Sequence, residues 1–274
     1  MQGGGGAISA LSRRAFSPAR NLLEEFGDMV LLTGRTVSSA LQPPYVYGGE
    51  LVSQFLFVLR LVWLPLLVST VAINYGAPGL QAANFLKLFG ALDFLGGFFV
   101  IEVVREIGPL ITAIVVAGVG GTAITADLGA RKVREELDAL QVLGVDPVKN
   151  LVVPRFLSLM LVTGLFNIYS ILFGLYGGLL AEIENGGSLG PFWHTLFANA
   201  TVTDLWGSVL KTTIFGAIIA IVSCYKGMTA SGGAEGVGRA VNEAVVVSFL
   251  AIGAFSYVFT TTLLATHPQI LVLK

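Results

Sequence analysis

Four ionisable side chains lie within stretches of the chain that are otherwise apolar: Arg60 in one stretch, and Glu102, Arg105 and Glu106 in another. A charged group inside a membrane is costly, so such residues usually bind a ligand or pair with one another. Glu102 and Arg105 are three residues apart, which places them on one helix face and predicts an ion pair. The alternative is a polar patch in a cavity, where Arg105 binds the carboxylate or phosphate of a lipid.

Arg60 has the same two interpretations, because it can pair with an acid or line the same cavity. It lies too deep in its stretch for the side chain to reach the membrane surface easily. The rest of such a cavity is expected to be apolar, and Trp63 is one candidate for its wall, although it fits a packing role equally well. The candidate substrate-binding residues are therefore Arg105, Glu102, Glu106, Arg60 and Trp63.

A short segment between the second and third apolar stretches, residues 133–143, has the pattern of an amphipathic helix. Val133, Leu137 and Leu140 recur at helical spacing and form one apolar stripe. Gly144 is expected to end the helix in the left-handed conformation, with Pro147 as a stop. The stripe either rests on the protein's own spans or inserts into a groove of a cytoplasmic partner, and the residues leave both open. The charged residues off the stripe are Arg134, Glu135, Glu136 and Asp138.

The sequence contains no arrangement of residues typical of catalysis. Its two histidines, His194 and His267, are far apart and make no metal cluster. The Gly-x-x-x-x-Gly-Lys-[Ser/Thr] phosphate loop is also missing, and the glycine-rich run 232–238 has no lysine, so it predicts a flexible turn. We therefore expect no enzymatic site, metal or cofactor in this chain.

The composition is that of an integral membrane protein. Of 274 residues, 54% are hydrophobic and only 12% are charged, and the mean hydropathy is +0.80. Soluble domains carry about 25% charged residues, which they need to cover their surface. The formal net charge of −1 gives no reason to expect nucleic-acid binding.

The expected fold is all-α, because an open sheet cannot satisfy its backbone in lipid. A membrane span needs about 20 mostly apolar residues, and five stretches qualify, at about 51–73, 94–126, 151–181, 205–225 and 244–265. Ahead of them, apolar residues at helical spacing over 21–41 predict a helix that lies on the membrane surface and ends at Pro43-Pro44. This divides the chain into an N-terminal segment, 1–44, and a membrane-spanning domain, 45–274.

Lysine and arginine are distributed unevenly between the two sides of the predicted spans. With the N-terminus in the cytoplasm, the outer segments hold three, Lys87, Lys211 and Lys274. The inner segments then hold eleven: Arg13, Arg14, Arg20, Arg35, Arg131, Lys132, Arg134, Lys149, Arg155, Lys226 and Arg239. Because cytoplasmic loops carry the excess of basic residues, we expect the N-terminus inside and the C-terminus outside. The segment 185–204 is then an outer loop.

Ordered motifs run from the second apolar stretch into the third. They are Arg105-Glu-Ile-Gly-Pro-Leu-Ile-Thr112, Ala117-Gly118, Thr122-Ala-Ile-Thr-Ala-Asp-Leu-Gly129, Glu135-Glu-Leu-Asp-Ala-Leu140, Gly144-Val-Asp-Pro147 and Val153-Pro-Arg155. In this order they resemble the MlaE/YrbE family of ABC transporter permeases, most closely the YrbE permeases of actinobacterial Mce systems. That family often has arginine after the Ala-Gly pair, where this chain has Val119, which suggests one member of a non-identical permease pair.

The resemblance implies a role in lipid transport across a bacterial inner membrane. It implies a second permease subunit, a cytoplasmic ATPase dimer that binds ATP and Mg, and MCE-domain proteins that form a lipid conduit on the outer side. The implied cargo is a fatty-acid-type lipid, a phospholipid or a sterol, and import is the expected direction. The implied ATPase-coupling residues are Val133, Arg134, Glu135, Glu136, Leu137, Asp138, Leu140, Gly144 and Pro147.

Two other classes of function fit a protein with five spans. A secondary transporter or channel often has inverted repeats around a midplane ion site, but no internal repeat is evident and five spans do not divide into equal halves. A membrane enzyme that acts on lipids would need a catalytic cluster. Transport driven by an ion gradient without an ATPase would favour the first of these alternatives.

Overall fold

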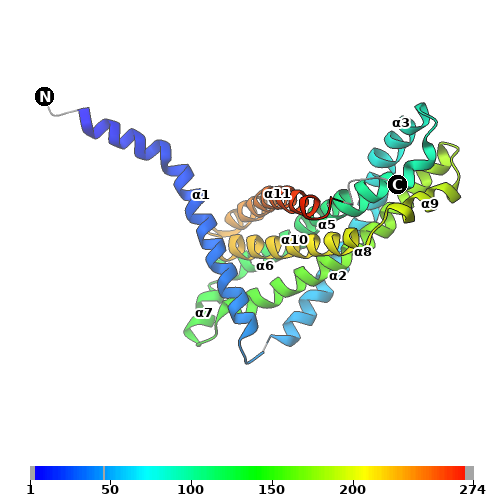
Figure 1. Ribbon diagram of the computed structural model, residues 1–274. Coiled ribbons are helices and arrows are strands. Elements are labelled where there is room, and N and C mark those ends of the chain that lie inside the picture. The colour runs from blue at the N-terminus through cyan, green and yellow to red at the C-terminus, as the bar shows by residue number, and fades with distance from the viewer. Residues whose placement is uncertain (1–3, 46, 269–274) are drawn as a thin grey trace.

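The computed structural model describes residues 4–45 and 47–268, with side chains from residue 23 onward. Within these residues every regular element is a helix, which confirms the all-α prediction. Five helical stretches are long and apolar enough to cross a membrane, as predicted. They are Gly48–Leu88, Leu92–Val133, Val148–Glu184, Val202–Met228 and Gly233–Thr266. Figure 1 shows these long helices as one bundle, with α7 (Glu136–Val142) at one end and α3 (Ala82–Leu88) and α9 (Leu189–Asn199) at the other.

The first span continues well beyond its predicted end at residue 73. It comprises α2 (Gly48–Asn74), the π-helical η1 (Tyr75–Gln81) and α3 (Ala82–Leu88). Pro78 cannot donate a backbone hydrogen bond and would normally break an α-helix. The wider π turn accommodates it, so the helix continues without a loop.

The second span contains two further π segments, so it is a series of short helices joined end to end. Their order is η2 (Leu92–Phe94), α4 (Leu95–Phe99), η3 (Val100–Ile107), α5 (Gly108–Val115), η4 (Val116–Gly121) and α6 (Thr122–Val133). The three charged residues singled out in this span, Glu102, Arg105 and Glu106, all lie in η3. The irregular backbone therefore occurs where the charges are, as is frequent for π turns at functional sites.

The later elements correct three expectations. They are η5 (Val148–Val152), α8 (Val153–Glu184), α9 (Leu189–Asn199), α10 (Val202–Met228) and α11 (Gly233–Thr266). The predicted outer loop 185–204 contains the helix α9, which packs on α4. The predicted turn 232–238 is mostly the first turns of α11, because only Gly232 and Gly233 have positive φ. Lys211, predicted outside the membrane, lies within α10.

The helix α8 is the centre of the bundle, and it packs against both α2 and α10. Its glycines let neighbouring helices approach closely, as is usual between membrane helices. A Cβ atom on Gly178 would lie 2.3 Å from the Phe99 ring, and one on Gly174 would lie 2.7 Å from Val103. A second apolar cluster around Phe99, Phe192 and Leu196 holds α4, α8 and α9 together at the far end of the bundle.

The N-terminal helix α1 (Gly4–Leu41) starts earlier than the predicted residue 21 and is followed by Pro43-Pro44, as predicted. It lies across the bundle (Figure 1) and contacts η5, α8 and α10. Met29, Leu32 and Thr36 are buried against the bundle. Other apolar side chains of α1 are exposed, among them Leu23, Phe26 and Leu31. This two-sided pattern agrees with the predicted helix on a membrane surface, whose position stays a prediction.

Candidate functional site

Arg105 pairs across the bundle with Asp204, and the predicted pair with Glu102 is wrong. The Nε atom of Arg105 lies 2.6 Å from Oδ1 of Asp204, and the two side chains are 10% and 0% exposed. In the π turn of η3, residues three apart no longer share a face as they do in an α-helix. Asp204 also accepts hydrogen bonds from the backbone N and hydroxyl of Thr201 at 2.9 and 2.7 Å, within a capping box at the start of α10.

Glu106 and Lys211 form a second ion pair beside the first. Nζ of Lys211 lies 2.8 Å from Oε2 of Glu106, and the Lys211 side chain is 2% exposed. Thr260 of α11 donates a hydrogen bond to Oε1 of Glu106 at 2.6 Å and accepts one from Lys211 at 2.9 Å. The two pairs and Thr260 line a narrow pocket between η3, α10 and α11. We call these five residues, Arg105, Asp204, Glu106, Lys211 and Thr260, the outer ion cluster.

Three members of the outer ion cluster were missed by sequence reasoning: Asp204, Lys211 and Thr260. The sequence predicts that Asp204 ends the outer loop and that Lys211 lies outside the membrane. The available signal was a lysine within the apolar run 205–225, because a charge at that depth needs a partner.

Below the outer ion cluster, the second span exposes an apolar stripe. Glu102, Glu106, Leu110, Ile114 and Gly118 follow one another at intervals of four residues. The two acids are half-buried, whereas the last three residues are exposed. The second span packs against α2 on one side and α11 on the other. This places a polar group at one end of an apolar surface, which is the pattern of a lipid headgroup and its acyl chain.

Arg60 and Trp63 lie elsewhere, on the exposed face of α2. Neither contributes to the pocket between η3, α10 and α11. Arg60 lines a shallow pocket with Ser53, Leu56, Phe57 and Leu61. The structure therefore separates the predicted cavity residues into two groups.

The predicted helix 133–143 is interrupted near its start. Val133 ends α6, Glu135 has a φ of 60° in the left-handed region, and α7 comprises Glu136–Val142. Arg134 pairs with Glu136 at 2.7 Å across this break. A left-handed non-glycine residue is uncommon, and no glycine marks the position. The predicted end is confirmed, because Gly144 has a φ of 76°.

The apolar residues of α7 face two ways. Leu137 is 4% exposed and belongs to the main core, and Leu140 packs against that core. Val142 and Leu143, at the end of the helix, are 88% and 76% exposed. Two residues of the predicted stripe, Leu137 and Leu140, thus rest on the protein's own spans, whereas the third, Val133, is 42% exposed. The free apolar surface at the end of α7 is the tip formed by Val142 and Leu143.

One buried arginine joins the first three spans near α7. Nη2 of Arg155 lies 2.6 Å from Oδ2 of Asp127 and 3.9 Å from Oε1 of Glu50, and Arg155 is fully buried. Asp127 also pairs with Arg131 at 3.2 Å. Asp127 therefore pairs with two arginines, and Arg155, counted above with the basic residues of the inner segments, is the closer of the two.

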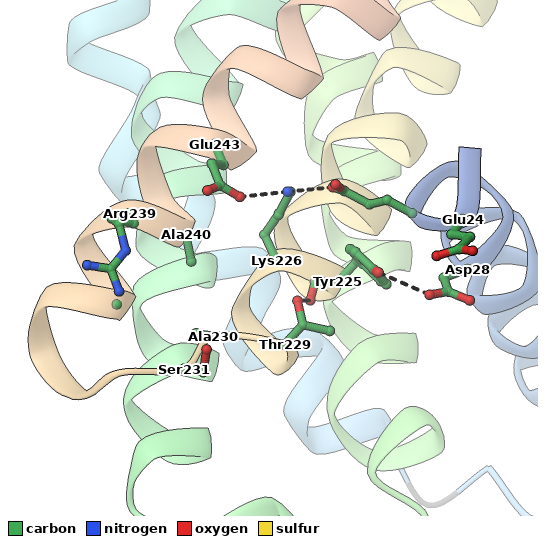
Figure 2. Close-up of a pocket in the computed structure, with 12 residues that line it drawn as sticks. Glu24, Asp28, Tyr225, Lys226, Thr229, Ala230, Ser231, Arg239, Ala240 and Glu243 are labelled. Atoms are coloured by element: carbon green, nitrogen blue, oxygen red, sulfur yellow. Dashed lines mark hydrogen bonds and ion pairs between the residues drawn. The ribbon is translucent and has the colours of Figure 1, made fainter. Parts of the chain in front are cut away.

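A second cation, Lys226, joins α1, α10 and α11 at the same end. Its Nζ lies 2.5 Å from Glu25 and 2.7 Å from Glu243, and the Tyr225 hydroxyl donates to Asp28 at 3.2 Å. Figure 2 shows these side chains around a polar cavity of about 360 Å³, with Arg239 on its far side. Because all three helices supply charges, the cluster fixes α1 to the bundle.

Comparison with known proteins identifies the family. A family model described as Permease MlaE matches residues 52–262. A probable ABC transporter permease protein of Synechocystis is 39% identical over 178 residues, which cover 63% of this chain and 66% of the relative, just under two thirds. A probable ABC transporter permease protein of Rickettsia typhi is 32% identical over 242 residues, 88% of this chain and 92% of the relative. The intermembrane phospholipid transport system permease protein MlaE of Haemophilus influenzae is 28% identical over 184 residues, 66% of this chain and 70% of the relative. The chain therefore belongs to the MlaE family of ABC transporter permeases.

Proposed function

We propose that this chain is the membrane subunit of an ATP-driven transporter that moves phospholipid or a related anionic lipid. The observation that carries the proposal is the outer ion cluster at one end of an exposed apolar stripe on the second span. The relative from Haemophilus influenzae, whose name assigns it to phospholipid transport, supports this class of cargo. A fatty acid has the same polarity, with a carboxylate in place of the phosphate, whereas a sterol has no anionic group.

The outer ion cluster has donors to spare for an anionic headgroup. Among the described residues, Asp204 takes the Nε donor of Arg105, and a guanidinium carries five N–H donors. The remaining donors suit two oxygens of a phosphate or carboxylate. Glu106 is 39% exposed, so an arriving anion meets it first and competes with it for Lys211. The acyl chain would then lie along Leu110 and Ile114.

The energy would come from other chains at the α7 end. Since the sequence carries no phosphate loop, a cytoplasmic ATPase dimer would bind ATP and Mg, and the exposed Val142 and Leu143 would dock into it. In this arrangement the N-terminus would lie in the cytoplasm and α9 outside, in a bacterial inner membrane. The apolar face that α11 exposes would meet a second permease, and MCE-domain proteins would receive or supply lipid beyond α9.

The test is lipid transfer by the assembled transporter in proteoliposomes that contain radiolabelled phospholipid. We expect ATP-dependent transfer, and at least a tenfold loss when Arg105→Gln is combined with Asp204→Asn, which removes both charges and leaves neither buried alone. Lys87→Gln, a basic residue outside the site, is the matched control and should transfer normally. Unchanged transfer by the double variant would exclude the outer ion cluster as the headgroup site.

Transfer driven by an ion gradient without the ATPase would instead favour a secondary transporter. Mass spectrometry of the retained lipid separates phospholipid, fatty acid and sterol.

A further inference from the structure

Arg60 stands apart from the other basic residues of the spans. Nine further lysine and arginine side chains described within the five spans each have a polar partner in the chain: Lys87, Arg105, Arg131, Lys132, Lys149, Arg155, Lys211, Lys226 and Arg239. Within the same described part of the chain, no hydrogen bond or ion pair reaches the side chain of Arg60. An arginine in this position needs an anion from outside the chain.

The depth of Arg60 follows from the contacts of α2. Glu50 lies beside the Arg155–Asp127 pair, and Ser158 donates a hydrogen bond to the backbone oxygen of Leu51 at 3.0 Å. These charges mark the α7 end of the membrane. Arg60 is ten residues further along the helix, about 15 Å at 1.5 Å per residue. That is about half of a 30 Å hydrocarbon layer.

The pocket beside Arg60 lies mostly on the part of α2 that precedes Arg60, toward the α7 end. Its other lining residues are Ser53, Leu56, Phe57 and Leu61, so most of it precedes Arg60 in the helix, and its volume is about 490 Å³. Helix side chains lean toward the N-terminus of their helix, which directs the guanidinium toward Ser53. The pocket thus offers one cation and one hydroxyl, enclosed by apolar side chains.

A second copy of this chain does not supply the missing anion. Two permeases related by a twofold axis along the membrane normal keep each residue at the same depth in both copies. The middle of every span is free of aspartate and glutamate, over 51–92, 107–126, 148–181, 205–228 and 244–266. A twofold axis close to Arg60 would instead bring it toward a second Arg60, and two like charges repel.

We propose that Arg60 and Ser53 bind the phosphate of a phospholipid from the leaflet at the α7 end, with its acyl chains against Leu56, Phe57 and Leu61. This site is separate from the outer ion cluster and lies nearer the opposite membrane surface. Its assignment to the cytoplasmic leaflet rests on the orientation given with the proposed function. The bound phosphate replaces the ion-pair partner that the chain does not provide.

The test is photo-crosslinking in membranes that contain the assembled transporter, without added ATP. Phe57→benzoylphenylalanine places the probe in the pocket, and Leu64→benzoylphenylalanine places it on the exposed face one turn beyond Arg60. Mass spectrometry then identifies the adducts. We expect phospholipid adducts at position 57 that fall at least fivefold with Arg60→Gln and persist with Arg60→Lys, which keeps the charge. Adducts at position 64 should not change, and Arg35→Gln, an exposed arginine of α1, should leave both yields unchanged.

Two results would overturn this assignment. Phospholipid adducts at position 57 that do not depend on Arg60 would show that the cation binds no headgroup. Adducts made mainly with another protein chain would show that a protein covers Arg60. Because the yield is measured without ATP, either result can occur in a transporter that still moves lipid through the outer ion cluster. Failure here is therefore distinguishable from failure of the proposed function.

Discussion

Breaking the Arg105–Asp204 pair should strongly destabilise the bundle. Both side chains are almost fully buried and lie 2.6 Å apart. Asp204→Asn removes one charge and leaves the guanidinium uncompensated, at a cost of about 3 to 5 kcal/mol for a buried pair. Arg105→Gln should cost a similar amount, because it leaves Asp204 buried alone. The double variant buries no lone charge, and its neutral groups can still form a hydrogen bond worth about 1 kcal/mol.

The assay is a double-mutant cycle on the free energy of unfolding, measured by steric trapping in bicelles. We expect the double variant to lose much less stability than the sum of the single variants, with a coupling energy of at least 2 kcal/mol, above the roughly 0.5 kcal/mol scatter of independent sites. Lys87→Gln combined with Asp204→Asn is the control and should show additive losses. Additivity in the Arg105–Asp204 cycle would refute the pair as the link between η3 and α10.

Two further predictions follow from burial. Leu143→Asp should reduce co-purification with the ATPase at least fivefold without lowering stability, because this side chain is 76% exposed at the tip of α7. Leu137→Asp, 4% exposed, should instead destabilise the fold, and equal effects of both variants on stability would contradict the two-faced α7. Gly178→Val should destabilise the bundle by about 1 to 3 kcal/mol through overpacking, since a Cβ atom there lies 2.3 Å from Phe99. Phe99→Leu should recover part of that loss, and a stable Gly178→Val protein would contradict the close approach of α8 and α4.

The number of membrane spans and their helical type could be predicted from sequence because hydropathy and helix length suffice for them, whereas α9 lies where the sequence predicts a loop. The residues at which these helices begin and end are harder to predict from sequence. Pro78 and its neighbouring glycines have the signature of a helix end, yet a π turn carries the first span to Leu88. The break at Glu135 has no glycine to mark it. The π turn at Pro78 and the break at Glu135 both depend on neighbouring helices that hold an unusual backbone conformation in place.

The charged residues of the second span were identifiable as candidates, but their partners were not. Spacing along a helix suggested Glu102 for Arg105, whereas the true partner, Asp204, is about a hundred positions away. Sequence periodicity reports which residues share a face of one helix, and it carries no information about which helices lie side by side. Lys211 could have been recognised as an intramembrane charge, but its pairing with Glu106 required the packing of η3 against α10.

The two cations near α7 divide the bundle mechanically. Arg155 ties α2, α6 and α8 into one unit, and α7 follows directly from α6. Lys226 ties α1, α10 and α11 into another. The two units are also packed closely on each other at this end, because Thr125 of α6 donates a hydrogen bond to the backbone oxygen of Ser223 at 3.2 Å, and a Cβ atom on Gly227 of α10 would lie 2.8 Å from Leu128. Force applied to α7 would therefore reach α2, α6 and α8 together through Arg155, and the Arg105–Asp204 pair would connect the second span to α10 at the opposite end.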